Sequence, residues 1–221
     1  MPIRNVLFDL DQTLIDFMKM KRESCRSALD AMIAVGLKVD REQGFDKLME
    51  TYLRVGIESN TAFEEFLKDL TGAVDRDILD AGIKGYIKAK PYYVKPYPYV
   101  LETLKFLKMN GIRLGLVTDA PREKAMYRLD TMGITKSFDV IVTYTESKAK
   151  KPSKIPFELA MKMMDIEAAD TLFVGDNLER DIEGARRLGM RALHIRRSED
   201  LKKIKKLIKK NLLAITIYVQ I

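Results

Sequence analysis

The chain has 221 residues, of which 47% are hydrophobic, and it carries a formal net charge of +7. That apolar content is ample for the core of one large domain or of a domain with an insertion. The single cysteine, Cys25, excludes an internal disulfide, no apolar run is long enough to span a bilayer, and no secretory signal is apparent, so we expect a soluble protein of the reducing cytoplasm.

The first predicted strand, residues 3–8, ends in two acids, Asp9 and Asp11, with one residue between them. Side chains two apart in a strand point the same way. Two like charges side by side are unfavourable unless a cation or a shared proton relieves them. This arrangement therefore predicts chemistry at the end of the strand.

Residues 16–90 contain no good strand and are predicted to be entirely helical. The helical patterns cover residues 17–35, 40–55 and 75–90, and another helix opens at Thr61–Glu64, which reads as a capping box. An insertion at the carboxyl end of a strand lies over the crevice where parallel sheets bind ligands, so we expect a lid. A linker rich in tyrosine and proline, residues 91–98, returns the chain to the core.

Strands and helices alternate in the rest of the chain. Four further strands are predicted at residues 113–118, 138–143, 171–174 and 191–195, and helices at 99–109, 122–132 and 180–188, each followed by a glycine that can close it. Alternation of this kind predicts an α/β fold with a Rossmann-like parallel sheet covered on both faces. The domains are then a core of residues 1–15 and 91–221 and a helical cap of residues 16–90.

The positive charge is concentrated in residues 196–210, where lysines alternate with apolar residues at helical spacing. This pattern is typical of a solvated helix face, so we expect no nucleic-acid partner and no membrane partner. The apolar, β-branched tail, residues 212–221, resembles a strand. It could extend a sheet edge, join a partner chain or pack on the core, which leaves a monomer and a homodimer open.

Polar residues follow the later strands as well, and together with the acidic pair they form an ordered set of motifs. The set comprises Asp9-Leu10-Asp11-Gln12-Thr13, then Thr118, then Lys151-Pro152, then Gly175-Asp176 with Asp181. In this order and at these strand ends, the motifs resemble those of the haloacid dehalogenase-like (HAD) hydrolase superfamily. The position of the helical insertion resembles its C1-capped phosphatase branch, which implies a HAD-like core beneath the cap.

The resemblance implies hydrolysis of a phosphate monoester through an aspartyl-phosphate. Asp9 would be the nucleophile, and Asp11 the general acid and base, with its backbone carbonyl on the metal. The metal would be Mg²⁺, a hard ion that prefers oxygen, held by Asp9, Asp11 and Asp176. Asp181 would support the metal site or anchor Lys151.

The remaining motif residues would bind the phosphoryl group. Lys151 would place positive charge on the transferring oxygens. Thr118 would hydrogen-bond them together with the backbone N–H groups of Asp119 and Ala120, and Thr13 would order the first loop.

Two positions depart from the family pattern. Gln12 stands where glycine or asparagine is common, and Lys154 stands where the pattern has a second proline. Other catalytic plans do not fit, because the only histidine, His194, lies within a predicted strand and is interpreted as structural. Cys25 lacks the arginine that a cysteine phosphatase loop requires.

The expected activity is that of a phosphatase acting on a small phosphorylated metabolite. Asp11 favours phosphate chemistry over dehalogenation, because a halide leaves unprotonated. A phosphomutase remains an alternative, as does a receiver-like module that accepts a phosphoryl group without turnover. Specificity should depend on residues of the helical insertion, and the candidates are Lys21, Arg22, Tyr52 and Arg54.

Overall fold

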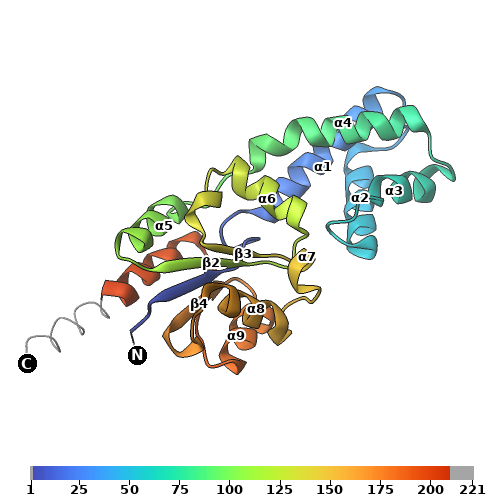
Figure 1. Ribbon diagram of the computed structural model, residues 1–221. Helices are drawn as coiled ribbons and strands as arrows, with labels where there is room; N and C mark the ends of the chain where they lie inside the picture. Colours follow the sequence, from blue (N-terminus) through green and yellow to red (C-terminus); the bar gives the residue numbers. More distant parts are fainter. Residues whose placement is uncertain (1, 210–221) are drawn as a thin grey trace, which may run out of the picture. The chain divides into compact units, whose positions relative to one another are not determined.

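The computed structural model describes residues 2–209, and the chain divides into two compact units. One unit, the core unit, holds the described residues up to Asp16 and from Lys95 onward, and the other, the helical unit, is Phe17–Val94. Figure 1 colours both units along the sequence. Each is described below by itself.

The core unit is built on a five-stranded sheet in the order β3-β2-β1-β4-β5. Every neighbouring pair of strands is parallel, which confirms the predicted α/β fold. The strands are β1 (Asn5–Phe8), β2 (Arg113–Val117), β3 (Val140–Val142), β4 (Thr171–Gly175) and β5 (Arg191–His194). The side chains of β1 are buried throughout, as expected for the central strand of a sheet covered on both faces.

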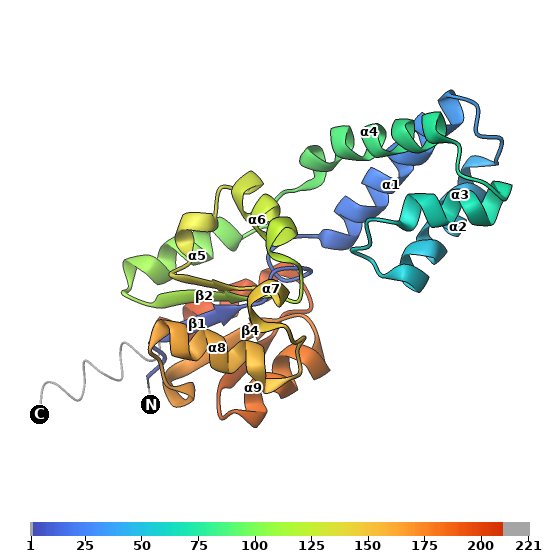
Figure 2. The same ribbon diagram turned by 45° about the vertical axis from the view of Figure 1, so that its right-hand side comes forward.

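Helices cover both faces of this sheet. One face carries α5 (Val100–Met109) and α6 (Arg122–Thr131), whereas α8 (Lys154–Met164) and α9 (Gly184–Arg187) lie on the other, as Figures 1 and 2 show. Between α8 and the sheet, the rings of Phe157 on α8 and Phe173 on β4 pack edge to face with centroids 5.0 Å apart. Burial of these apolar faces fixes the sheet, and with it the ends of the strands.

The helical unit consists of α1 (Phe17–Ala34), α2 (Arg41–Val55), α3 (Ala62–Thr71) and α4 (Arg76–Tyr93). It has its own apolar core, which includes the buried Phe45, Leu48 and Phe66. Helices α1 and α4 lie side by side in both views. Gly85 permits this approach, because a Cβ there would lie 2.7 Å from the backbone oxygen of Ser27.

Two helix ends in this unit differ from the prediction. Thr61 does not form the expected capping box, since its side chain makes no cap hydrogen bond. Its backbone is itself near-helical, and its hydroxyl pairs instead with Ser59 at 3.0 Å. Helix α4 also continues through Pro91 to Tyr93, beyond the predicted end at residue 90.

Differences in the core unit concern short helical segments. A capping box is present at Thr143 and Glu146, where it opens the short helix α7 (Tyr144–Ser147) that was not predicted. The predicted helix 180–188 begins instead as a π-helical turn, η3 (Leu178–Glu183), before α9.

The lysine-rich segment is helical over residues 201–209 and buries Leu201, Ile204 and Ile208. This matches the helical spacing of its apolar residues. The apolar tail at 212–221 lies outside the described residues. Within the described part of the chain, no helix combines the length and the apolar character needed to cross a membrane.

Candidate active site

The parallel register brings the ends of three strands to one level. Phe8 of β1 pairs with Leu116 of β2 on one side and with Val174 of β4 on the other. The residues that follow these strands therefore leave the sheet at the same carboxyl edge. Asp9, Thr118 and Asp176 are those residues, as the sequence predicts.

Lys151 joins the motifs in a network of short polar contacts. Its Nζ donates to Asp9 Oδ1 at 2.5 Å and to the backbone oxygen of Val117 at 3.0 Å. The same Nζ lies 2.7 Å from Asp181 Oδ1. The side chain is 1% exposed, so the ammonium group has exchanged water for three protein oxygens.

Burial and charge act in opposite directions at this network. Burial raises the pKa of Asp9 well above its ordinary value against the opposing effect of Lys151, and the carboxylates of Asp181 and Asp11 raise it further. Burial alone would lower the pKa of Lys151, but Asp9 and Asp181 raise it instead. Lys151 is therefore a permanent cation, and the carboxyl of Asp9 beside it resists ionisation.

Three carboxylates form a cluster suited to a cation. Asp9, Asp176 and Asp181 each offer an oxygen atom, and these atoms lie within 4.8 Å of one another. Burial and the Asp181 charge raise the pKa of Asp176. Among the described residues, the buried Asp176 Oδ1 has no hydrogen-bond partner. A hard divalent ion would satisfy that atom and offset the repulsion between the carboxylates.

Gly175 lets the cluster form, because it is the residue against which Asp181 packs. A Cβ at position 175 would lie 2.5 Å from Asp181 Oδ2, an impossible contact. Asp181 Oδ2 also accepts the backbone N–H of Asn177 at 3.0 Å, so the carboxylate has little freedom to move away.

Gly175→Ala is therefore expected to lower the free energy of unfolding by about 1–3 kcal/mol, the usual cost of overpacking. Denaturant midpoints compared with the wild type measure the effect. Gly44→Ala is the control, because its Cβ would meet only side-chain methyl groups at 3.0 Å or more. Equal midpoints for Gly175→Ala and the wild type would contradict the close packing described here.

The loop after β2 is positioned by its own side chains. The backbone N–H of Ala120 donates to Thr118 Oγ1 at 3.2 Å, so the N–H predicted to bind phosphate is engaged and the Thr118 hydroxyl keeps its hydrogen for another acceptor. Asp119 Oδ1 accepts the backbone N–H of Lys151 at 2.9 Å, and its Oδ2 lies 3.3 Å from Arg180. The Asp119 side chain thus ties the loop after β2 to those after β3 and β4.

The loop after β1 turns sharply at Gln12. Its φ of 62° lies in the left-handed region that favours glycine, which gives a physical reason for the glycine common at this position of the motif. Thr13 is fully buried beneath this turn. His194 lies at the other side of the site, with Nε2 2.7 Å from the backbone oxygen of Asp176.

Asp11 has a partner that the sequence motifs do not include. Arg128 on α6 donates from Nη1 to Asp11 Oδ1 at 3.1 Å and to Oδ2 at 2.9 Å. One signal in the sequence points to this arginine. It occupies a position on the apolar stripe of its helix, near Ala125 and Leu129, where a charged residue is unusual.

The predicted specificity residues of the helical unit fall into two groups. Lys21 and Tyr52 are buried together, with Lys21 Nζ 3.8 Å from the Tyr52 ring centroid and 3.3 Å from the hydroxyl of Tyr86. Arg22 and Arg54 are exposed, and Arg54 pairs with Asp69.

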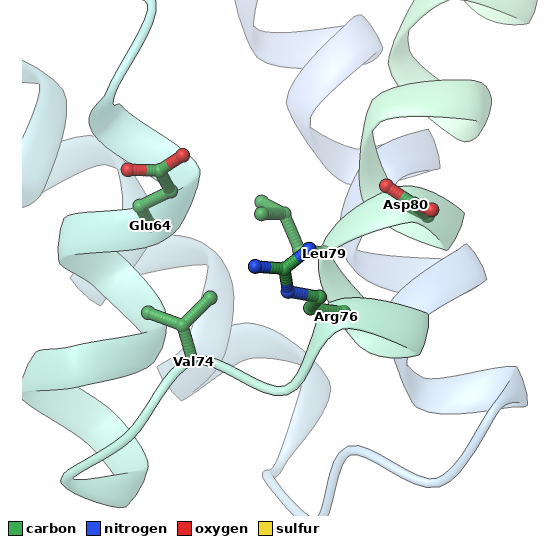
Figure 3. A pocket seen from close by; sticks show the side chains of 5 residues that line it. All are labelled: Glu64, Val74, Arg76, Leu79 and Asp80. Carbon is green, nitrogen blue, oxygen red and sulfur yellow. The ribbon is translucent and has the colours of Figure 1, made fainter.

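The helical unit also has a hollow between α3 and the start of α4, shown in Figure 3. It is lined by Glu64, Val74, Arg76, Leu79 and Asp80. These residues include none of the predicted site residues, and their mixed charges do not favour one class of ligand.

Comparison with known proteins supports the interpretation of the motifs. The family model described as haloacid dehalogenase-like hydrolase matches residues 6–195. A glyceraldehyde 3-phosphate phosphatase from Methanocaldococcus jannaschii is 33% identical over 193 residues, which cover 87% of this chain and 85% of the relative. A phosphoglycolate phosphatase from Aquifex aeolicus is 31% identical over 191 residues, covering 85% of this chain and 82% of the relative.

A solved structure shares the fold. The crystal structure of a HAD phosphatase from Thermococcus onnurineus superposes with a TM-score of 0.67 at 25% identity, covering 88% of this chain and 87% of that one. The likeness extends over both sides of the helical insertion, as the order of the motifs requires.

Proposed function

Because this chain belongs to the haloacid dehalogenase-like hydrolase family, we propose that it is a Mg²⁺-dependent phosphatase that hydrolyses small phosphate monoesters through an aspartyl-phosphate. The similar proteins named above are phosphatases of small phosphorylated metabolites by name. The observation that carries the proposal is the contact of 2.5 Å between Asp9 and the buried Lys151, beside two further carboxylates.

The reaction has two steps, formation and hydrolysis of the aspartyl-phosphate, and each side chain has a separate role in them. Asp9 attacks phosphorus and forms the covalent intermediate, while Asp11 gives a proton to the leaving oxygen. Asp11 then takes a proton from the water that releases phosphate. Lys151 and the Thr118 hydroxyl stabilise the oxygens on which charge develops.

The carboxylate cluster fits the metal that this chemistry calls for. Asp9, Asp176 and the backbone carbonyl of Asp11 would hold Mg²⁺, with Asp181 in support. The bound ion supplies positive charge that favours the ionised, nucleophilic form of Asp9 and screens the repulsion between it and the phosphate. This is consistent with the raised pKa of both Asp9 and Asp176.

The assay for this function measures inorganic phosphate released from glyceraldehyde 3-phosphate, phosphoglycolate and similar small esters. We expect turnover with Mg²⁺ and a loss of about 10²-fold or more after chelation, because the ion provides several kcal/mol of charge stabilisation. Restoring Mg²⁺ should restore the rate.

Two results would overturn the proposal. One is the absence of phosphate release from every ester of the panel in the presence of Mg²⁺. The other is stable phosphorylation of the protein by acetyl phosphate without turnover, which would indicate a receiver-like module.

A further inference from the structure

Outside the sequence motifs, the guanidinium of Arg128 is an unusual buried group. Its side chain is only 1% exposed, whereas that of its partner Asp11 is 25% exposed. A single nitrogen, Nη1, bridges both carboxylate oxygens at 3.1 and 2.9 Å. The arginine thus reaches Asp11 from inside the protein, and the carboxylate keeps one side toward solvent.

Stability alone does not account for an arginine at this place. Arg128 shares the buried face of α6 with Ala125 and Leu129, where an apolar side chain would pack without desolvating a charge. Replacing a buried ion pair with well-packed apolar residues is often neutral or stabilising. A buried arginine is therefore better explained by what it does to its partner.

Arg128 restricts the orientation of the Asp11 carboxylate. Asp9, Asp176 and Asp181 form the carboxylate cluster, and Asp11 is not one of its members. The bridge from Arg128 holds the Asp11 carboxylate by both oxygens. An acid that must reach a leaving oxygen gains from such constraint, because proton transfer requires hydrogen-bond distance and a locked rotamer.

We propose that Arg128 is a positioning residue that holds the Asp11 carboxylate in one orientation for proton transfer. The proposal rests on the phosphatase function proposed above. It predicts that substitution of Arg128 slows the steps in which Asp11 transfers a proton and leaves the other steps unchanged.

The dependence on leaving group provides the first test. An alkyl phosphate needs protonation of its leaving oxygen, whereas the acetate of acetyl phosphate departs unprotonated. Arg128→Met should therefore lower kcat/KM for a small alkyl phosphate by about 10–10²-fold, part of the usual contribution of a general acid. For acetyl phosphate we expect a loss of kcat/KM below about threefold, because kcat/KM covers the steps up to the departure of acetate and not the later hydrolysis in which Asp11 acts as base.

Matched variants separate positioning from general damage. Arg122→Met removes an exposed arginine of the same helix, paired with Glu146, and should leave both rates unchanged. Arg128→Lys retains a buried cation in case the methionine variant does not fold, and it should show a smaller loss with the same selectivity for the alkyl ester. Equal losses of kcat/KM for both substrates, in whichever variant folds, would overturn the proposal.

A double-mutant cycle provides the second test. If Arg128 acts through Asp11, adding Arg128→Met to Asp11→Asn should cause no further loss for the alkyl phosphate, whereas independent effects would multiply. Multiplying losses would contradict the proposal. An inactive wild-type protein would instead contradict the proposed function, so the two failures are distinguishable.

Discussion

Asp9→Asn is expected to lower phosphate release by at least about 10³-fold, because removing a covalent nucleophile eliminates the step on which the others depend. The amide is nearly isosteric with the carboxylate. Lys151 retains Asp181 and the Val117 carbonyl as acceptors, so the fold should persist. Release of inorganic phosphate and a thermal unfolding curve measure the two halves of this expectation.

Asp165→Asn is the matched control for this change. It also removes one carboxylate from the core unit, but at the left-handed C-cap of α8, where φ is 52° and asparagine is well tolerated. Its rate should equal that of the wild type. An Asp9→Asn variant that kept the wild-type rate would eliminate the aspartyl-phosphate mechanism.

Lys151→Met should affect both stability and activity. Removing one partner of a buried ion pair costs about 3–5 kcal/mol, because the remaining charge is left uncompensated. Here Asp9 and Asp181 would both lose their cation. We expect the free energy of unfolding at neutral pH, without metal, to fall by an amount of that order, and turnover to be lost with it.

The pH dependence of this loss has a definite sign. The pKa of Asp9 is already raised by burial in the folded protein, so its contribution to stability declines as pH rises from the unfolded value, about 3.9, through the folded pKa. Without Lys151 the folded pKa rises further. The stability difference between variant and wild type should therefore shrink as pH falls, because a protonated Asp9 no longer needs a cation.

Lys150→Met is the control for position and charge, since Lys150 is the adjacent residue and its side chain is exposed. Its denaturant midpoint should match the wild type across the pH range. A Lys151→Met variant as stable as the wild type at neutral pH would contradict the buried network.

The site could be predicted from sequence where strand ends determine it. Asp9, Thr118 and Asp176 directly follow strands, and the parallel order of those strands forces them to one edge of the sheet. Period-two and period-3.6 patterns reveal such strands and helices without knowledge of their packing. That is why the α/β fold and the proximity of the motif residues were accessible.

Contacts made by side chains across the fold were not accessible in the same way. The bridge from Arg128 to Asp11 joins residues 117 positions apart. The sequence motifs predict a role for the backbone N–H of Asp119 but not for its side chain. Local capping was equally uncertain, because Thr61 and Thr143 both begin a threonine-x-x-glutamate pattern and only Thr143 forms the box. In each case the outcome depends on which competing partner lies within reach after packing.

The buried network around Lys151 also determines the chemical reactivity of its amine. An amine attacks a carbonyl only through an unprotonated nitrogen, and neighbouring carboxylates hold the Lys151 nitrogen in its ammonium form. Three oxygens surround this nitrogen, so it is not available for attack on a carbonyl. The same contacts that bury this positive charge among acidic groups therefore keep Lys151 from acting as a nucleophile.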